Sequence, residues 1–203
     1  MAATSKVFPM FRPIVRYADF AGRSTRTEFW LFLLFYYLVV AGFASLVVGD
    51  SLAGGHIDWD KFLTNYMRFA PLLSLFNLAL FLPNLAVRTR RLHDMRRSGW
   101  WVLFPYVIAF IAYIVFFIVN GAVFLQTAMD IGQKMQTLGD PASITPAAMI
   151  RLEIPLWQLL LPWVFLPTLA AELIMCVAYA WPGTKGTNRF GPDPRLGAPT
   201  EVF

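Results

Sequence analysis

The chain has 203 residues, of which 58% are hydrophobic and 14% are charged. Charged residues make up about 25% of a typical soluble domain, so this composition excludes an ordinary soluble protein and indicates that lipid surrounds much of the chain. The length fits a single polytopic membrane domain, residues 1–203. The formal charge is +5, but the positions of the cations indicate membrane topology and argue against nucleic acid as a partner.

Four long apolar segments predict an all-α fold, a four-helix transmembrane bundle. Each segment reaches the roughly 20 residues that a helix needs to cross a hydrocarbon core about 30 Å thick. The predicted spans are residues 28–48, 67–87, 100–124 and 156–181.

Two local signals precede the first span. Apolar residues recur at helical spacing from Val7 to Ala18, which predicts either a short N-terminal interfacial helix or a tail packed on the bundle. Thr25 and Glu28 have the spacing of a capping box. In that motif Thr25 accepts a hydrogen bond from the helix, and the Glu28 carboxylate returns to the amide of the cap residue.

The two connections on the opposite side of the predicted bundle differ in length. Residues 50–66 form an acidic loop, whereas residues 125–155 form a longer segment. In the longer one, apolar residues keep helical spacing from Ala128 to Leu138, and Thr145 and Pro146 then have the pattern of a cap and first helical position. We therefore expect two short outer amphipathic helices.

The cations are distributed unevenly between the two sides. Thirteen of the 17 lysines and arginines lie in residues 1–27, 88–99 and 182–203. The other cations are Lys61, Arg68, Lys134 and Arg151. The positive-inside rule therefore predicts that both termini and the 88–99 link lie in the cytoplasm.

Polar residues inside the predicted spans form stripes that are expected to face one another. They include Asn77, Asn84, Tyr113, Asn120 and Glu172. Glu172 lies near the middle of its span, where an unpaired carboxylate would be protonated; alternatively, it pairs with Arg88. The pattern fits a proton- or cation-handling site, and it also fits ordinary polar contacts between helices.

The densest polar motif is Arg90-Arg91-Leu92-His93-Asp94-Met95-Arg96-Arg97-Ser98-Gly99-Trp100-Trp101. His93 and Asp94 have the chemistry of a base and its partner or of metal ligands, but the only other histidine, His56, lies on the opposite side. We therefore predict no catalytic residues, no metal site and no cofactor. Two interpretations of the arginines remain: they bind phosphates or lipid headgroups, or they pair with Asp94, Glu28 or chain carbonyls.

Residues 182–194 follow the last span and are rich in proline and glycine, which predicts an ordered turn rather than a helix. Gly186, Thr187 and Asn188 could offer backbone amides to an anion, but the lysine-Ser/Thr pair of a phosphate loop is missing. Cys176 is the only cysteine, so no internal disulfide is possible.

Three motifs together resemble one bacterial inner-membrane family, domain-of-unknown-function family 805. They are Phe20-x-Gly22-Arg23-x-x-Arg26-x-Glu28-Phe29-Trp30, Arg91-Leu92-His93-Asp94-x-x-Arg97-Ser98-Gly99-Trp100-Trp101 and Gly186-x-Asn188-Arg189-Phe190-Gly191-Pro192-Asp193-Pro194. The resemblance implies a small multi-pass protein of the bacterial inner membrane with all three motifs in the cytoplasm, and it supplies no activity. Met95-Arg96 stands where a small residue and glycine are common in the family, which adds charge and is expected to stiffen the loop.

These observations predict a non-enzymatic membrane protein whose three cytoplasmic motifs converge into one basic surface with aromatic residues at its edge. The expected partners are anionic lipid headgroups or a protein, which includes a second copy of this chain. The residues expected to form the surface are Arg23, Arg26, Arg91, His93, Asp94, Arg97, Trp100, Trp101, Asn188 and Arg189. The alternative is a small proton- or cation-linked transporter or channel that uses Glu172.

Overall fold

The structure, a computed structural model, describes residues 7–53, 56–137, 156 and 158–196. Four helical segments are long and apolar enough to cross a membrane: Arg26–Ser51, Trp59–Asp94, Gly99–Lys134 and Gln158–Ala180. The prediction of a helical fold with four transmembrane helices is therefore confirmed.

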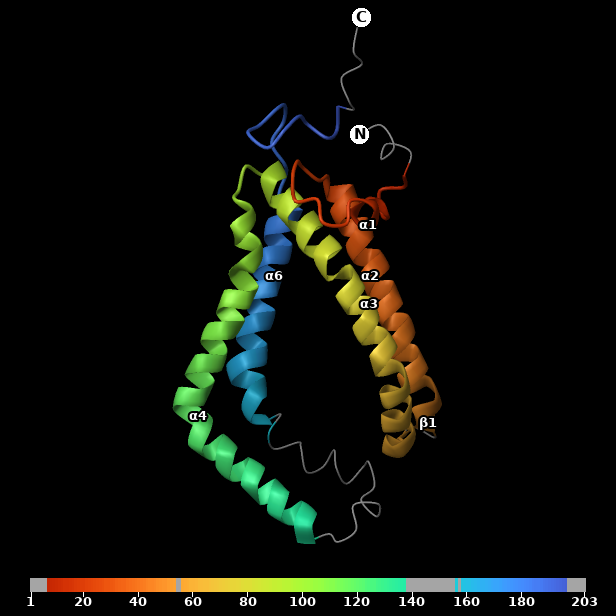
Figure 1. Ribbon diagram of the computed structural model, residues 1–203, viewed down its shortest axis with the longest axis vertical. Coiled ribbons are helices and arrows are strands. Elements are labelled where there is room, and N and C mark those ends of the chain that lie inside the picture. Colours follow the sequence, from red (N-terminus) through yellow and green to blue (C-terminus); the bar gives the residue numbers. More distant parts are fainter. Residues whose placement is uncertain (1–6, 54–55, 138–155, 157, 197–203) are drawn as a thin grey trace, which may run out of the picture. The chain divides into compact units, whose positions relative to one another are not determined.

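The elements follow one another along the chain as labelled in Figure 1. They are α1 (Arg12–Val15), α2 (Arg26–Val48), η2 (Gly49–Ser51), β1 (Leu52–Ala53), β2 (His56–Ile57), α3 (Trp59–Asp94), η3 (Gly99–Leu103), α4 (Phe104–Thr137), η5 (Leu161–Phe165) and α6 (Leu166–Ala180). The segments η2 and η3 are 3-10 turns, and η5 is a π-helical turn that leads into α6.

The chain divides into two compact units, which we describe separately. The first unit comprises Met1–Ala44, Ala70–Leu103 and Met175–Phe203. The second unit comprises Ser45–Phe69 and Phe104–Ile174.

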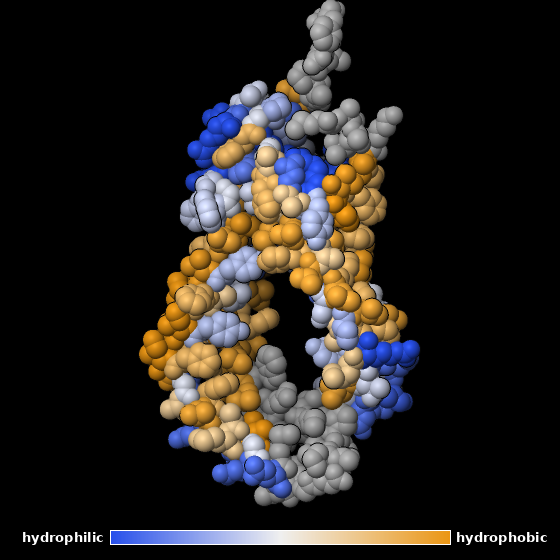
Figure 2. Space-filling view, in the orientation of Figure 1, coloured by the Kyte–Doolittle hydropathy of each residue, from blue (hydrophilic) through white to orange (hydrophobic). Residues whose placement is uncertain are grey.

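The first unit has an apolar core built from three helices. Phe29 and Phe32 of α2, Val87 of α3 and Tyr179 of α6 are at most 2% exposed. The rings of Phe29 and Tyr179 lie 4.8 Å apart, so α2 and α6 are in direct contact. Figure 2 shows hydrophobic side chains along these helices, whereas hydrophilic side chains gather where α2 begins and where α3 and α6 end.

The N-terminal segment of the first unit packs on α2. Its helix α1 is a single turn, with Pro13 buried. The Phe11 ring meets Phe35 of α2 edge to face, with the ring centroids 5.6 Å apart. This contact agrees with the expectation of a tail packed on the bundle.

Helix α3 begins earlier than the apolar pattern predicts, at Trp59 rather than near residue 67. Asp58 explains the difference, because its carboxylate accepts a hydrogen bond from the Lys61 amide (3.2 Å) and caps the helix. The helix also continues past residue 87 to Asp94, because its last polar residues are buried by the chain segments described below. Capping and burial, rather than hydrophobicity, therefore set the ends of α3.

In the second unit, a short hairpin precedes α3, and Leu52 pairs with Ile57 across β1 and β2. Helix α4 packs against η5, and Phe116 is fully buried against Phe124, with ring centroids 5.7 Å apart. The first predicted outer helix is not separate, because α4 is continuous to Thr137. The second, which would begin at Thr145, lies outside the described residues.

Candidate functional site

Three segments that are distant in the sequence meet at one end of the first unit. We call this region the polar end, and it consists of residues 19–28, 89–101 and 181–196. Backbone hydrogen bonds join the segments directly: the Ser24 amide donates to the Arg90 carbonyl (3.1 Å), and the Thr184 amide donates to the Asp94 carbonyl (2.9 Å). The fold thus brings together residues of all three sequence motifs.

Asp94 is the central acceptor of the polar end. Arg23 donates to its Oδ1 from Nε (2.9 Å) and from Nη2 (2.7 Å), and Arg91 donates to its Oδ2. All three side chains are buried, with residue exposures of 2% for Asp94, 5% for Arg23 and 0% for Arg91. A carboxylate out of water needs such compensation, because an unpaired buried charge costs several kcal/mol.

The two arginines also bind the chain at and after the end of α6. Arg91 donates from Nε to the Tyr179 carbonyl (2.9 Å) and from Nη2 to the Trp181 carbonyl. Arg23 donates from Nη1 to the Gly186 carbonyl (2.6 Å). The last carbonyls of a helix lack amide partners, so these guanidinium groups satisfy the end of α6 and fix the direction of the chain after it.

A second ion pair ties α2 to α3. Arg90 Nη2 lies 3.3 Å from Glu28 Oε1, and both residues are buried. Arg90 also donates to the Asp19 carbonyl. The Glu28 amide donates to Thr25 Oγ1 (3.1 Å), which confirms the Thr25 half of the predicted capping box. The other half is corrected, because the Glu28 carboxylate accepts from Arg90 instead of returning to the cap amide. We refer to Arg23, Glu28, Arg90, Arg91 and Asp94 as the buried ionic cluster.

Close packing over Asp94 depends on a glycine. A Cβ atom built at Gly183 would overlap the Asp94 carboxylate, so only glycine lets the backbone cross at this point. Thr184, the next residue, donates to the Asp94 carbonyl from its amide (2.9 Å) and from its hydroxyl (3.0 Å). The C-terminal segment is therefore seated directly on the buried ionic cluster.

Two side chains order the C-terminal segment itself. Asn188 Nδ2 donates to the His93 carbonyl (3.0 Å), which connects this segment to α3. Asp193 accepts from the Gly186 amide (3.1 Å) and from Arg195 Nε (2.7 Å). These hydrogen bonds lower the pKa of Asp193 from 3.8 to about 2, and the bond from the Arg195 side chain has the largest effect. The Asp193 carboxylate is therefore ionised at neutral pH.

His93 is held by contacts with its neighbours. Its ring stacks on Phe190 with the centroids 3.9 Å apart and the planes at 5°. Its Nδ1 lies 3.2 Å from the Gly22 carbonyl. His93 therefore links the same three segments as Asp94, from the more accessible side.

The structure separates the predicted surface residues into two groups. Arg23, Arg91 and Asp94 lie inside the buried ionic cluster, which is the pairing interpretation of these residues. The exposed residues are Arg26, Arg97, Trp100, Trp101 and Arg189, and Asn188 and His93 are half-buried. The exposed part of this predicted set is thus formed by the second group.

Arg96 is an exposed cation that the predicted set of surface residues does not include. Arg96 has a φ of +59°, the left-handed conformation that L residues rarely adopt. It ends α3 in a Schellman motif, in which the Arg97 amide donates to the Leu92 carbonyl (2.9 Å) and the Arg96 amide donates to the His93 carbonyl (3.1 Å). Glycine usually occupies this position, and the family difference at Met95-Arg96 was the available signal.

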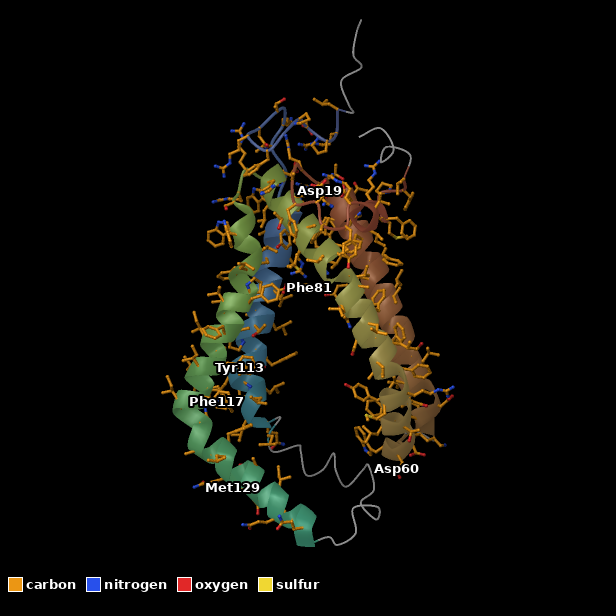
Figure 3. The ribbon with its side chains drawn as sticks, viewed as in Figure 1. Asp19, Asp60, Phe81, Tyr113, Phe117 and Met129 are labelled. Carbon is orange, nitrogen blue, oxygen red and sulfur yellow. The ribbon has the colours of Figure 1, made fainter. Side chains whose placement is uncertain are left out.

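The predicted intramembrane polar residues fall in different parts of the chain. In the first unit, Tyr36 donates to Asn77 Oδ1 (2.5 Å), and Asn84 is half-buried on α3. Tyr113, Asn120 and Glu172 belong to the second unit, where Tyr113 is exposed on α4 (Figure 3). Within the described part of the chain, no group of three or more His, Cys, Asp or Glu residues could hold a metal ion.

Comparisons with known proteins agree with this architecture. Inner membrane protein YhaH of Escherichia coli (strain K12) is 34% identical to this chain over 106 residues, which are 51% of this chain and 76% of YhaH. Inner membrane protein YhaI of the same strain is 36% identical over 110 residues, 52% of this chain and 78% of YhaI. No solved structure matches the chain.

A family model described as "Protein of unknown function (DUF805)" matches residues 17–135. The matched region contains the first two sequence motifs and the whole of α2 and α3, and it ends before the third motif. The chain therefore belongs to the DUF805 family, and it is similar to bacterial inner membrane proteins, with four helices that are long and apolar enough to cross a membrane.

Proposed function

We propose that this protein is a non-enzymatic inner-membrane protein whose polar end lies in the cytoplasm and binds anionic lipid headgroups. The proposal rests on one observation: the described carboxylates of the polar end form ion pairs with other arginines and not with a group of exposed cations. Among the described residues, no carboxylate forms an ion pair with Arg26, Arg96, Arg97, Lys185 or Arg189. The positive charge of this surface is therefore available to an external anion.

The backbone at Arg96 supports the same proposal. A left-handed L residue costs about 1–2 kcal/mol relative to its ordinary conformation. A charged side chain kept at such a position is typical of sites where function outweighs local stability. The strain and the exposed charge at Arg96 together favour an anion-binding role for the turn that ends α3.

Exposed aromatic side chains beside the arginines favour a membrane surface over a soluble anion. Trp100 is 79% exposed and Trp101 is 52% exposed, directly after the turn. Tryptophan is enriched where headgroups meet hydrocarbon, and each arginine near an anionic leaflet contributes about 1 kcal/mol. The cytoplasmic orientation follows from the charge asymmetry of the sequence.

The contacts of His93 and Asp94 support a non-enzymatic role. Asp94 accepts from Arg23 and Arg91 and is 2% exposed, so it is not accessible to a substrate. His93 is stacked on Phe190 and has no nucleophile among the described residues in hydrogen-bond contact with its ring. These contacts indicate that His93 and Asp94 hold the packing of the polar end together and do not act as a catalytic base and its partner.

The experiment measures lipid enrichment around the purified full-length protein in bilayer nanodiscs that contain phosphatidylcholine and phosphatidylglycerol. We expect enrichment of phosphatidylglycerol that declines with added salt, because salt screens exposed charges. The double variant Arg96→Glu/Arg97→Glu should abolish the enrichment. The control Lys61→Glu/Lys134→Glu reverses the same number of charges in the second unit and should leave it intact.

Two results would contradict the proposal. One is equal enrichment in both double variants, which would mean that the polar end is not the binding surface. The other is a co-purified polypeptide that is lost in Arg96→Glu/Arg97→Glu while lipid enrichment is unchanged, which would assign the surface to a protein partner.

A second candidate function is a small proton- or cation-linked transporter or channel that uses Glu172. The π-helical turn η5 favours it, because π-turns within helices occur frequently at functional sites. Glu172 is half-buried on α6 about two turns after η5. Proton or cation flux into proteoliposomes that disappears in Glu172→Gln but persists in Cys176→Ser would support this function, and no flux with the wild-type protein would exclude it.

A further inference from the structure

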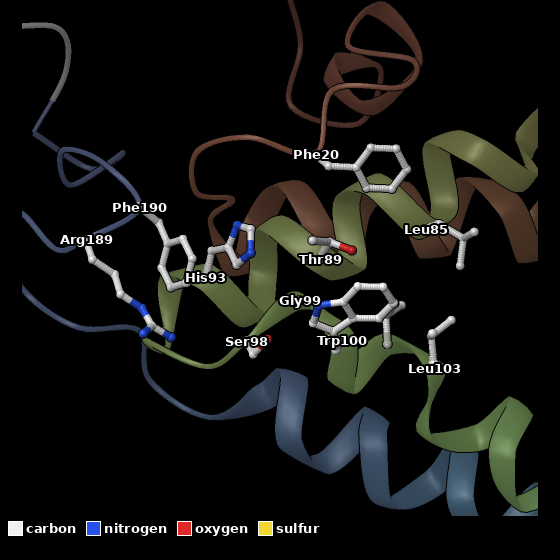
Figure 4. Close-up of a pocket in the computed structure, with 11 residues that line it drawn as sticks. Phe20, Leu85, Thr89, His93, Ser98, Gly99, Trp100, Leu103, Arg189 and Phe190 are labelled. Atoms are coloured by element: carbon white, nitrogen blue, oxygen red, sulfur yellow. The ribbon is translucent and has the colours of Figure 1, made fainter.

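An open groove of about 680 Å³ lies at the polar end of the first unit. This volume is within the range of about 300–1,000 Å³ that is typical of small-ligand sites. One wall is formed by α3 and the other by η3, and residues of the C-terminal segment close one end (Figure 4). All of the residues that line it belong to the first unit.

The groove changes from polar to apolar along its length. Leu85, Thr89 and His93 are four residues apart on α3, so they line one helical face over about 12 Å. Figure 4 shows Arg189 at the end near His93, whereas Leu85 and Leu103 lie at the other end. A ligand that fits this gradient has an anionic head and a hydrocarbon tail.

The groove is preformed by close packing. A Cβ atom at Gly99 would lie 2.6 Å from Thr89 Cγ2 and 3.1 Å from His93 Nε2, so only glycine allows the turn to approach α3 this closely. The stacking on Phe190 fixes the ring of His93 on the same wall. A site that is already ordered loses little conformational entropy when a ligand binds.

Charge complementarity identifies the sign of the ligand. No carboxylate is among the described residues that line the groove. Arg189 is exposed, and its guanidinium carbon lies 4.6 Å from the centroid of the Phe190 ring, which orients the cation at the polar end. Trp100, which lines the groove and is 79% exposed, is the residue type expected at the headgroup boundary.

We infer that the groove binds one anionic phospholipid, with its phosphate at Arg189 and an acyl chain along Leu85 and Leu103. This inference rests on the proposed function and names one specific site within it. Attraction at the exposed arginines is electrostatic and is screened by salt, whereas a lipid in the groove also buries hydrocarbon. The groove lipid is therefore the one that remains bound at high salt.

Native mass spectrometry of the detergent-solubilised full-length protein tests the inference, with phosphatidylglycerol as the probe at high salt. The wild-type protein should retain one phosphatidylglycerol molecule. Arg189→Glu should weaken this retention severalfold, because it places a carboxylate in direct contact with the phosphate, within the screening length of about 3 Å that remains at 1 M salt. Lys185→Glu makes the same charge change in the same segment outside the groove, and it should retain the lipid as the wild type does.

A second variant blocks the apolar end without changing charge. Leu103→Trp should reduce the retained lipid to a similar extent as Arg189→Glu, because the larger ring occupies the path of the acyl chain. Soluble glycerol 3-phosphate, which has the anionic group but no hydrocarbon, should not displace the lipid. Displacement by this compound would overturn the lipid assignment in favour of a free phosphate ester.

The remaining outcomes separate this inference from the proposed function. Equal retention in Arg189→Glu and Lys185→Glu, or a bound polypeptide in place of the lipid, would overturn the groove site. Salt-sensitive enrichment in nanodiscs could still be lost in Arg96→Glu/Arg97→Glu, in which case the broader proposal would stand. Retention of one lipid by Arg96→Glu/Arg97→Glu at high salt supports two distinct binding modes.

Discussion

At the scale of single residues, Arg96 shows where this chain departs from the most stable choice. Its left-handed backbone ends α3, and the next amide closes the Schellman motif on Leu92. Glycine would make the same turn without a Cβ penalty. From the sequence, Met95-Arg96 is expected to stiffen the turn. That expectation does not include the energetic cost of a positive φ at Arg96, which applies to any residue other than glycine whatever its size.

We predict that Arg96→Gly raises the free energy of unfolding by about 1 kcal/mol, because it relieves the strain, while the larger entropy of glycine in the unfolded chain offsets part of the gain. Thermal unfolding in detergent measures the change. The same variant should weaken phosphatidylglycerol enrichment. Arg97→Gly is the matched control, since it removes the same charge without relieving strain. An equal gain in both variants would contradict the explanation.

Asp94 is the residue on which the polar end most depends. It accepts from two buried arginines, so replacing its charge leaves both guanidinium groups without their anion. We predict that Asp94→Asn lowers the free energy of unfolding by about 3–5 kcal/mol. Asp130→Asn removes one partner of an exposed pair with Lys134 (2.6 Å) and should leave the unfolding temperature unchanged. Similar small shifts in both variants would show that burial does not govern the Asp94 pair.

At the scale of elements, the C-terminal segment is ordered by side-chain hydrogen bonds and glycines rather than by regular structure. Gly183 crosses Asp94, Asn188 reaches the His93 carbonyl, and Asp193 closes the turn on the Gly186 amide. Each of these contacts requires its residue type: a glycine without a Cβ atom at the crossing, and a side-chain amide or carboxylate that reaches a backbone group. The segment should therefore detach as a unit when one of these contacts is lost.

The pH dependence of this segment follows from Asp193. Its pKa is lowered from 3.8 to about 2 in the folded protein, so the ionised form stabilises the fold. This contribution is fully present above about pH 4 and is lost as the pH falls toward 2. The protection factor of the Gly186 amide, which compares its hydrogen-exchange rate with that of an unstructured peptide at the same pH, should stay high from pH 7 to about pH 4 and fall below it.

The Asp193→Asn variant provides the comparison. It should show faster exchange at Gly186 already at neutral pH, and the acid-dependent step should disappear. Asp58→Asn alters a cap in the second unit and should leave Gly186 exchange unchanged. A step between pH 5 and 7 in the wild-type protein would contradict the assignment to Asp193.

The accuracy with which the helices and their ends could be predicted depended on which sequence property was used. The four spans follow from hydrophobicity, and the Thr25 cap follows from local spacing, so both are confirmed. Helix α3 extends beyond the predicted span at both ends, and α4 continues to Thr137, where the sequence predicts a separate outer helix. Hydropathy measures the part of a helix that suits lipid, whereas Asp58 and the polar residues beyond each span extend the helix past that part.

At the scale of the whole molecule, the sequence predicts which motifs share one end but not which arginines are buried there. Arg90, Arg91, Arg96 and Arg97 are neighbours in the sequence, yet the first two are fully buried and the last two are exposed. The difference arises because α3 ends at Asp94 and only the residues before that point face α2 and α6. Pairing with Glu28 or Asp94 thus depends on three-dimensional contacts that no local pattern contains.

The buried ionic cluster also constrains membrane topology. It connects the beginning of α2, the end of α3 and the chain after α6, so these three points must lie on one side of the membrane. The charge asymmetry of the sequence predicts that this side is the cytoplasmic one. Both the proposed lipid-binding surface and the proposed lipid site in the groove depend on this arrangement.

Single-cysteine labelling tests the arrangement most directly. In a Cys176→Ser background, Arg97→Cys, Lys185→Cys and Lys61→Cys each provide one reactive site for a maleimide that does not cross membranes. With intact spheroplasts we predict that Lys61→Cys reacts at once, whereas Arg97→Cys and Lys185→Cys react only after the membrane is permeabilised. Labelling of Arg97→Cys and Lys185→Cys from opposite sides, or of both from outside, would contradict the account.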